Sequence, residues 1–184
     1  IRAAKYSDMP LINYLAAAFM AQRQHALARR DNYLLIAQKA DADHPIVVGL
    51  TQARLQIFNQ QWEEALATLK HLQQLRPKNA FILQLLEQAY LELKDWAGLK
   101  TLLPALRKRR AFSIEEINRL ELKVYRELLS ISKTNRTIEI EWDRLPGYLQ
   151  KHPAIVAIYA EYLLDNKQYE AAEAILKMIL RKVL

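Results

Sequence analysis

Four histidines are the side chains of this sequence best suited to metal binding or proton transfer: His25, His44, His71 and His152. No two of them have the spacing that places a metal-binding pair on one face of a helix. No Ser/His/Asp grouping stands out, and no pair of carboxylates lies alone in an apolar stretch. The chain has no cysteine, which excludes disulfides, thiolate metal sites and cysteine nucleophiles. We therefore expect no catalytic residue, no metal site and no cofactor, and predict that the protein is not an enzyme.

The chain carries a net charge of +7, and its densest group of cations is the run Arg107, Lys108, Arg109 and Arg110. A basic chain can meet nucleic acid, anionic lipid or acidic protein surfaces. The simpler interpretation of the run is that it ends a helix, where cations favour the negative end of the helix dipole. A helical repeat that binds nucleic acid would need a basic stripe in every unit. Because the run occurs once, we expect no nucleic-acid partner.

Two polar residues, Arg54 and Gln88, occupy equivalent places 34 positions apart. In a stack of helix pairs the first helix of each pair lines an inner groove, so equivalent side chains are neighbours. A row of this kind could hold an extended peptide by hydrogen bonds; the alternative is that both side chains are simply solvated. The candidate groove residues are Asn13, Leu50, Arg54, Gln84, Gln88 and Glu161.

The elements that would carry these residues are helices. Apolar residues make up 52% of the chain and only three glycines occur, whereas good helix formers are abundant. Trp62 and Trp96 lie 34 positions apart, each just after a polar corner, and the same shift aligns Leu69 with Leu103. A 34-residue period of helix, corner and helix is the tetratricopeptide signature. Within one repeat, Ala53 lets the paired helices approach closely.

The repeat is irregular in one region, between Phe112 and His152. Ser113 and Glu116 form a capping box that predicts a helix to about Ser132. A second helix is expected to carry Trp142, Leu145 and Leu149, with Pro146 kinking it or lying near its start. The predicted fold is an all-α, right-handed superhelix of about five helix pairs. It forms a single domain, 1–184, with repeats at roughly 9–44, 45–78, 79–112, the irregular pair 113–152, and 153–184.

Several segments resemble the repeat region of the proteobacterial HemY-type inner-membrane proteins. They are the runs 10–18, 51–56 and 86–90, and the stretch Trp142-Asp143-Arg144-Leu145-Pro146 followed by His152-Pro153 and Tyr159-Ala160. The resemblance covers nearly the whole chain. It implies a membrane anchor ahead of the repeats, and a chain that begins at Ile1 rather than at methionine is expected to be a fragment that lacks it.

The resemblance also implies a function and a place in the cell. HemY-type proteins are linked to a late stage of haem biosynthesis, with a proposed role in organising other enzymes. The expected function is therefore a non-catalytic scaffold that binds other proteins, among them haem-biosynthesis enzymes. The alternative is a carrier that binds haem or a porphyrin directly. The expected location is the bacterial inner membrane, with the repeat domain on the cytoplasmic side.

Overall fold

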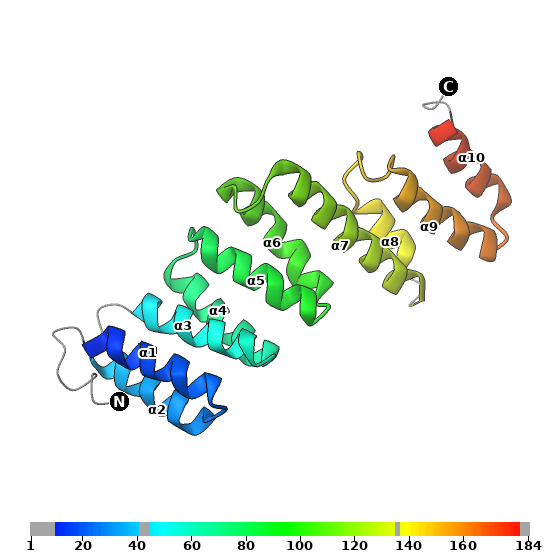
Figure 1. Cartoon of the computed structure of the whole chain (residues 1–184). Helices are drawn as coiled ribbons and strands as arrows, with labels where there is room; N and C mark the ends of the chain where they lie inside the picture. Colours follow the sequence, from blue (N-terminus) through cyan, green and yellow to red (C-terminus); the bar gives the residue numbers. More distant parts are fainter. Residues whose placement is uncertain (1–9, 41–44, 135–136, 181–184) are drawn as a thin grey trace. The chain divides into compact units, whose positions relative to one another are not determined.

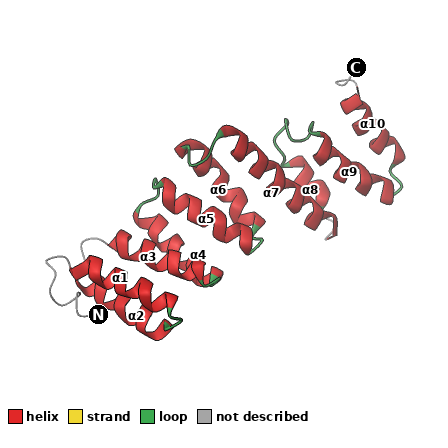
Figure 2. Cartoon of the chain, viewed as in Figure 1, coloured by secondary structure: helices red, strands yellow, loops and turns green. Residues whose placement is uncertain are grey.

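The computed structural model describes residues 10–40, 45–134 and 137–180, and within these ranges it contains helices and no strand (Figures 1 and 2). The helices are α1 (Pro10–Arg23), α2 (Leu27–Ala40), α3 (Pro45–Phe58), α4 (Trp62–Leu75), α5 (Ala80–Glu92), α6 (Trp96–Arg109), α7 (Ile114–Thr134), α8 (Ile138–Asp143), α9 (Pro153–Asp165) and α10 (Tyr169–Leu180). The prediction of an all-α fold built from consecutive helices is confirmed, and the handedness of the superhelix stays a prediction.

The chain divides into two compact units, Ile1–Lys94 and Asp95–Leu184. In the first unit each helix packs against the next from α1 to α5, and α1 also contacts α3. In the second unit α6 packs on α7, α7 contacts both α8 and α9, and α9 packs on α10. Contacts are therefore local in sequence, as expected when each helix pair buries its apolar face mainly against its neighbours.

Small residues let α3 and α4 approach closely in the first unit. Ala53 and Ala65 are fully buried, and Leu69 on α4 is buried as well. A methyl group added at Gly49 would lie only 2.6 Å from Cδ2 of the buried Leu72. The predicted role of Ala53 as a close-packing position therefore agrees with its burial, and Gly49 is a second such position on the same helix.

The corners between paired helices share one backbone geometry. His25, Gln60, Lys94 and Lys167 each lie two residues after the first helix of a pair and two residues before the second, with φ of 55°, 59°, 53° and 60°. This left-handed conformation costs a non-glycine residue about 1 kcal/mol, and glycine is its usual occupant. Because none of the four is glycine, a search for glycine corners misses this regularity.

A buried polar network links the α1–α2 corner to the α3–α4 corner. Arg30 is 5% exposed, and its Nη1 donates to the side-chain oxygens of Gln22 at 3.0 Å and Gln61 at 3.1 Å. Asn59 Nδ2 donates to the same two oxygens at 3.2 and 3.4 Å, and Gln22 Nε2 donates back to Asn59 Oδ1. Arg30 also pairs with the exposed carboxylate of Asp31 at 2.6 Å. The network fixes α1 beside α3.

In the second unit the predicted capping box begins α7. Ser113 N donates to Glu116 Oε2 at 2.8 Å, and Glu116 N donates to Ser113 Oγ at 3.2 Å. The helix runs to Thr134, slightly beyond the predicted end. Further along, the Trp142 and Tyr159 rings stack with centroids 4.2 Å apart, which joins α8 to α9.

The helix predicted to carry Trp142, Leu145 and Leu149 is shorter than expected. Helix α8 ends at Asp143, so only Trp142 is helical, while Leu145 and Leu149 lie in the turns that follow and are buried. Pro146 explains the difference: it lacks an N–H and disfavours helical geometry in the residue before it. The prediction that Pro146 kinks a helix or lies near its start is therefore wrong.

Candidate functional site

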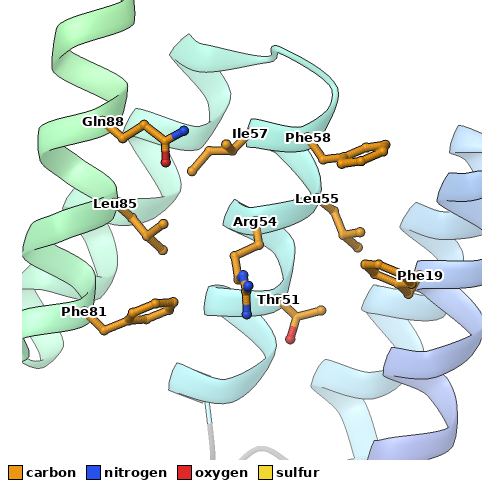
Figure 3. Close-up of a pocket in the computed structure, with 9 residues that line it drawn as sticks. All are labelled: Phe19, Thr51, Arg54, Leu55, Ile57, Phe58, Phe81, Leu85 and Gln88. Atoms are coloured by element: carbon orange, nitrogen blue, oxygen red, sulfur yellow. The ribbon is translucent and has the colours of Figure 1, made fainter.

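The candidate site is an open pocket of about 660 Å³ in the first unit (Figure 3). Three helices, α1, α3 and α5, contribute to it, each the first helix of its pair. The lining residues are Phe19, Thr51, Arg54, Leu55, Ile57, Phe58, Phe81, Leu85 and Gln88.

Helical spacing places the pocket residues of α3 on one face. Thr51, Arg54 and Phe58 are separated by three and four positions, which brings their side chains together on the helix surface. The helix also carries Gly49 and Ala53, both fully or nearly buried, on the side that packs within the unit. One helix therefore supplies both the packing face and the pocket face.

Three exposed aromatic rings line the pocket. Phe19, Phe58 and Phe81 are 52%, 66% and 40% exposed, whereas side chains of this type are usually buried in a soluble protein. They come from three different helices and converge on one cavity, so they are not isolated surface residues. A patch of this kind is typical of a surface that is covered by a partner.

The charge of the pocket comes from Arg54. Its guanidinium lies over the Phe81 ring, 5.6 Å from the centroid, in a cation–π arrangement. No carboxylate among the described residues pairs with Arg54, and the residues that line the pocket include none that is acidic. The site can therefore supply apolar contact, one positive charge and amide and hydroxyl hydrogen bonds from Gln88 and Thr51.

The structure brings together two of the predicted groove residues, Arg54 and Gln88 (Figure 3). Asn13, Leu50 and Gln84 are partly buried on the same three helices but do not line the pocket. Their role in binding stays a prediction.

Glu161, the remaining predicted groove residue, lies on α9 in the second unit. Its carboxylate pairs with Lys133 Nζ at 3.0 Å, and Asp165 pairs with the same ammonium at 3.1 Å. The hydrogen bond to Glu161 is the main cause that raises the pKa of Lys133, and the bond to Asp165 raises it further. Glu161 therefore takes part in an ion-pair group between α7 and α9.

Sequence reasoning missed the three phenylalanines of the pocket, although a signal was present for two of them. Phe58 lies four positions after Arg54, and Phe81 lies seven positions before Gln88, so each shares a helix face with a predicted groove residue. Extending the two polar positions into helical stripes would have included Phe58 and Phe81.

The basic run lies at the end of α6. Arg107, Lys108 and Arg109 form its last turn, and Arg110 caps it with a left-handed φ of 50°. Arg107 pairs with Glu121 at 2.7 Å and donates to Asn118 at 3.2 Å. This position agrees with the helix-ending interpretation of the run.

A second cavity of about 520 Å³ lies beside this run, in the second unit. Arg107, Glu121, Tyr148 and His152 are among its lining residues. The pKa of Tyr148 is raised to about 12, mainly by partial burial and also by a hydrogen bond to Glu121. Because Glu121 interacts with both Arg107 and Tyr148, these polar groups already have partners within the protein.

The histidines are dispersed in the structure. His25 occupies the α1–α2 corner, His71 is exposed on α4, and His152 caps α9 through Nδ1, which accepts from Ala154 N at 3.3 Å. His44 lies outside the described residues. Within the described ranges, no three potential ligands from histidine, cysteine, aspartate and glutamate gather as a metal site would require.

Comparison with curated proteins gives distant relatives. The chain is 26% identical over 176 residues to the protein named HemY of Escherichia coli K12, and equally to those of E. coli O157:H7 and Shigella flexneri. The chain is a distant relative of HemY. The match covers 94% of this chain but 44% of each relative, so the chain spans less than half of their length. The resemblance seen in the repeat segments is thereby confirmed.

Other comparisons add no further relative. No protein-family model matches the chain, and no solved structure matches it. Among the described helices, none combines the length and the apolar character needed to cross a membrane.

Proposed function

We propose that this chain is a non-catalytic scaffold that binds other proteins, and that the pocket between α1, α3 and α5 is its binding surface. The observation that carries the proposal is the convergence of three exposed phenylalanines on one cavity in the first unit. Aromatic side chains of this kind anchor protein interfaces because they bury a large apolar area at a small entropic cost. Arg54 and Gln88 add directional bonds.

The pathway and the location are part of the same proposal. The relatives named HemY support a role beside the enzymes of haem biosynthesis, as the resemblance of the repeat segments implies. In the full-length protein the repeat region would be tethered to the bacterial inner membrane by an anchor and would face the cytoplasm. Its partners would be enzymes of a late step of that pathway.

The experiment that tests the scaffold is affinity purification from cell extract with three versions of the chain. They are the wild type, the Arg54→Ala, Gln88→Ala double variant, and a control, Lys70→Ala. Lys70 is a suitable control because it also lies over an aromatic ring, that of Tyr90 at 5.5 Å, but on α4 away from the pocket lining. Haem-pathway enzymes should be enriched by the wild type and the control, and lost by the double variant.

The other outcomes are equally informative. Enrichment that the double variant retains would keep the scaffold and move its binding surface away from the pocket. No enriched protein at all would refute the scaffold. A haemin titration, followed by the Soret band, would then test the carrier alternative.

A further inference from the structure

Arg54 divides the candidate pocket into two apolar halves (Figure 3). One half lies towards α1 and the other towards α5, and Arg54 with Thr51 stands between them on α3. The first half is lined by Phe19, Leu55 and Phe58, and the second by Ile57, Phe81 and Leu85.

The Arg54 guanidinium is held in a form suited to a carboxylate. Its central carbon, Cζ, lies over the Phe81 ring at 5.6 Å from the centroid. A planar guanidinium presents several N–H donors along its edge, and these can form a bidentate bond to a planar anion such as a carboxylate. No carboxylate lines the pocket among the described residues, so none of these lining side chains neutralises the cation.

The single positive charge and the apolar surface of the pocket limit which class of ligand can bind there. An entirely apolar segment would cover Arg54 and remove its water without giving it a partner, which is costly. A nucleic acid or a lipid surface would need several cations, because such ligands present many phosphates. The pocket has one cation between two apolar surfaces, and this matches one carboxylate between two apolar side chains.

We propose that the pocket binds a peptide segment of a partner protein in which a single aspartate or glutamate lies between two apolar residues. This inference rests on the proposed scaffold function and names the chemistry of its partner. The carboxylate pairs with Arg54. The flanking apolar side chains fill the two halves, against Phe58 on one side and Phe81 on the other.

The test is a selection of displayed random short peptides on the whole chain, run in parallel with three variants. The wild type should enrich peptides with one acidic residue between two apolar ones. Arg54→Gln should lose the acidic preference but keep the apolar one. Arg54→Glu should instead select lysine or arginine at the central position. The control Lys70→Glu should select the same peptides as the wild type, since Lys70 lies outside the pocket lining.

A matched pair of synthetic peptides then gives the magnitude. For a selected peptide, exchange of its central glutamate for glutamine should weaken binding to the wild type about tenfold, because one charge-assisted contact is lost. The same exchange should change little for Arg54→Gln, whose circular dichroism spectrum verifies the fold.

Three results overturn the inference. Peptides enriched without an acidic preference, or with one that Arg54→Gln retains, refute the carboxylate pairing and leave the scaffold. An empty selection beside a successful affinity purification refutes this pocket as the peptide site and also leaves the scaffold. An empty selection together with an empty purification refutes the scaffold as well.

Discussion

Replacing Arg30 with methionine tests whether the buried polar network holds α1 beside α3. The Arg30 guanidinium donates two bonds from Nη1 to neutral amide oxygens, at 3.0 Å to Gln22 and at 3.1 Å to Gln61. A bond from a charged donor contributes about 1.5–3 kcal/mol, so the two together contribute at least about 3 kcal/mol. The pair with Asp31 adds little, because that carboxylate is 60% exposed.

Two effects reduce the loss. Each amide oxygen keeps a bond from Asn59 Nδ2, so neither is left without a partner. Methionine also fills much of the same volume and removes the cost of burying a charge. We therefore expect Arg30→Met to lower the free energy of unfolding of the first unit by about 2 kcal/mol.

The assay is urea denaturation with hydrogen exchange read separately for peptides of α1 to α4, because the two compact units need not unfold together. Arg29 is a matched control, since it is the adjacent arginine on the same helix and is exposed. Arg29→Met should change stability by less than about 0.5 kcal/mol. If Arg30→Met is as stable as the control or more so, the network contributes no net stability and the argument fails.

Three further predictions concern backbone geometry, close packing and a helix cap. Gln60→Gly should raise the free energy of unfolding by about 0.5–1 kcal/mol, because glycine removes the left-handed strain at φ 59°; an unchanged or lower melting temperature would contradict this. Gly49→Ala should destabilise by about 1 kcal/mol, since its methyl group would meet Leu72 Cδ2 at 2.6 Å, and chemical denaturation in a Leu72→Ala background should no longer detect this cost. Hydrogen bonds from Ser113 lower the pKa of Glu116. The stabilisation that the Glu116 carboxylate gives to α7 is therefore present above the ordinary glutamate pKa and is lost as the pH falls through the lowered pKa. Amide protection of the first turn of α7 should fall in acid for the wild type, and a Glu116→Gln variant with the same pH dependence would refute the assignment.

Much of the fold is predictable from the sequence because large side chains recur with the period of the repeat. The sequence predicts that Trp62 and Trp96 each begin the second helix of a pair. Helices α4 and α6 do begin at these residues. The capping box of α7 is likewise local, since the side chain of each of Ser113 and Glu116 accepts a bond from the other residue's backbone N–H. Signals that lie within a few residues of one another do not depend on the rest of the chain.

Other features could not be predicted because they depend on contacts between distant residues. In the sequence Arg30 is one of two adjacent arginines, and no residue near it in the chain indicates that it is buried against Gln61. The end of α8 was missed for a different reason: Trp142, Leu145 and Leu149 have helical spacing and are all buried, but the chain reaches those positions through turns. Periodicity reports which side chains face the core and does not identify the backbone that carries them there.

Helix α3 carries its exposed pocket residues and its closest packing contacts at different positions. Arg54 and Phe58 line the pocket and are exposed, whereas Gly49 and Ala53 are buried and carry the close packing of the helix. Leu55 also lines the pocket but belongs to the core. Exchanges at exposed helix positions usually alter stability by less than about 0.5 kcal/mol. The exposed part of the pocket can therefore change residue by residue, in evolution or by design, while the helix pair that supports it stays intact.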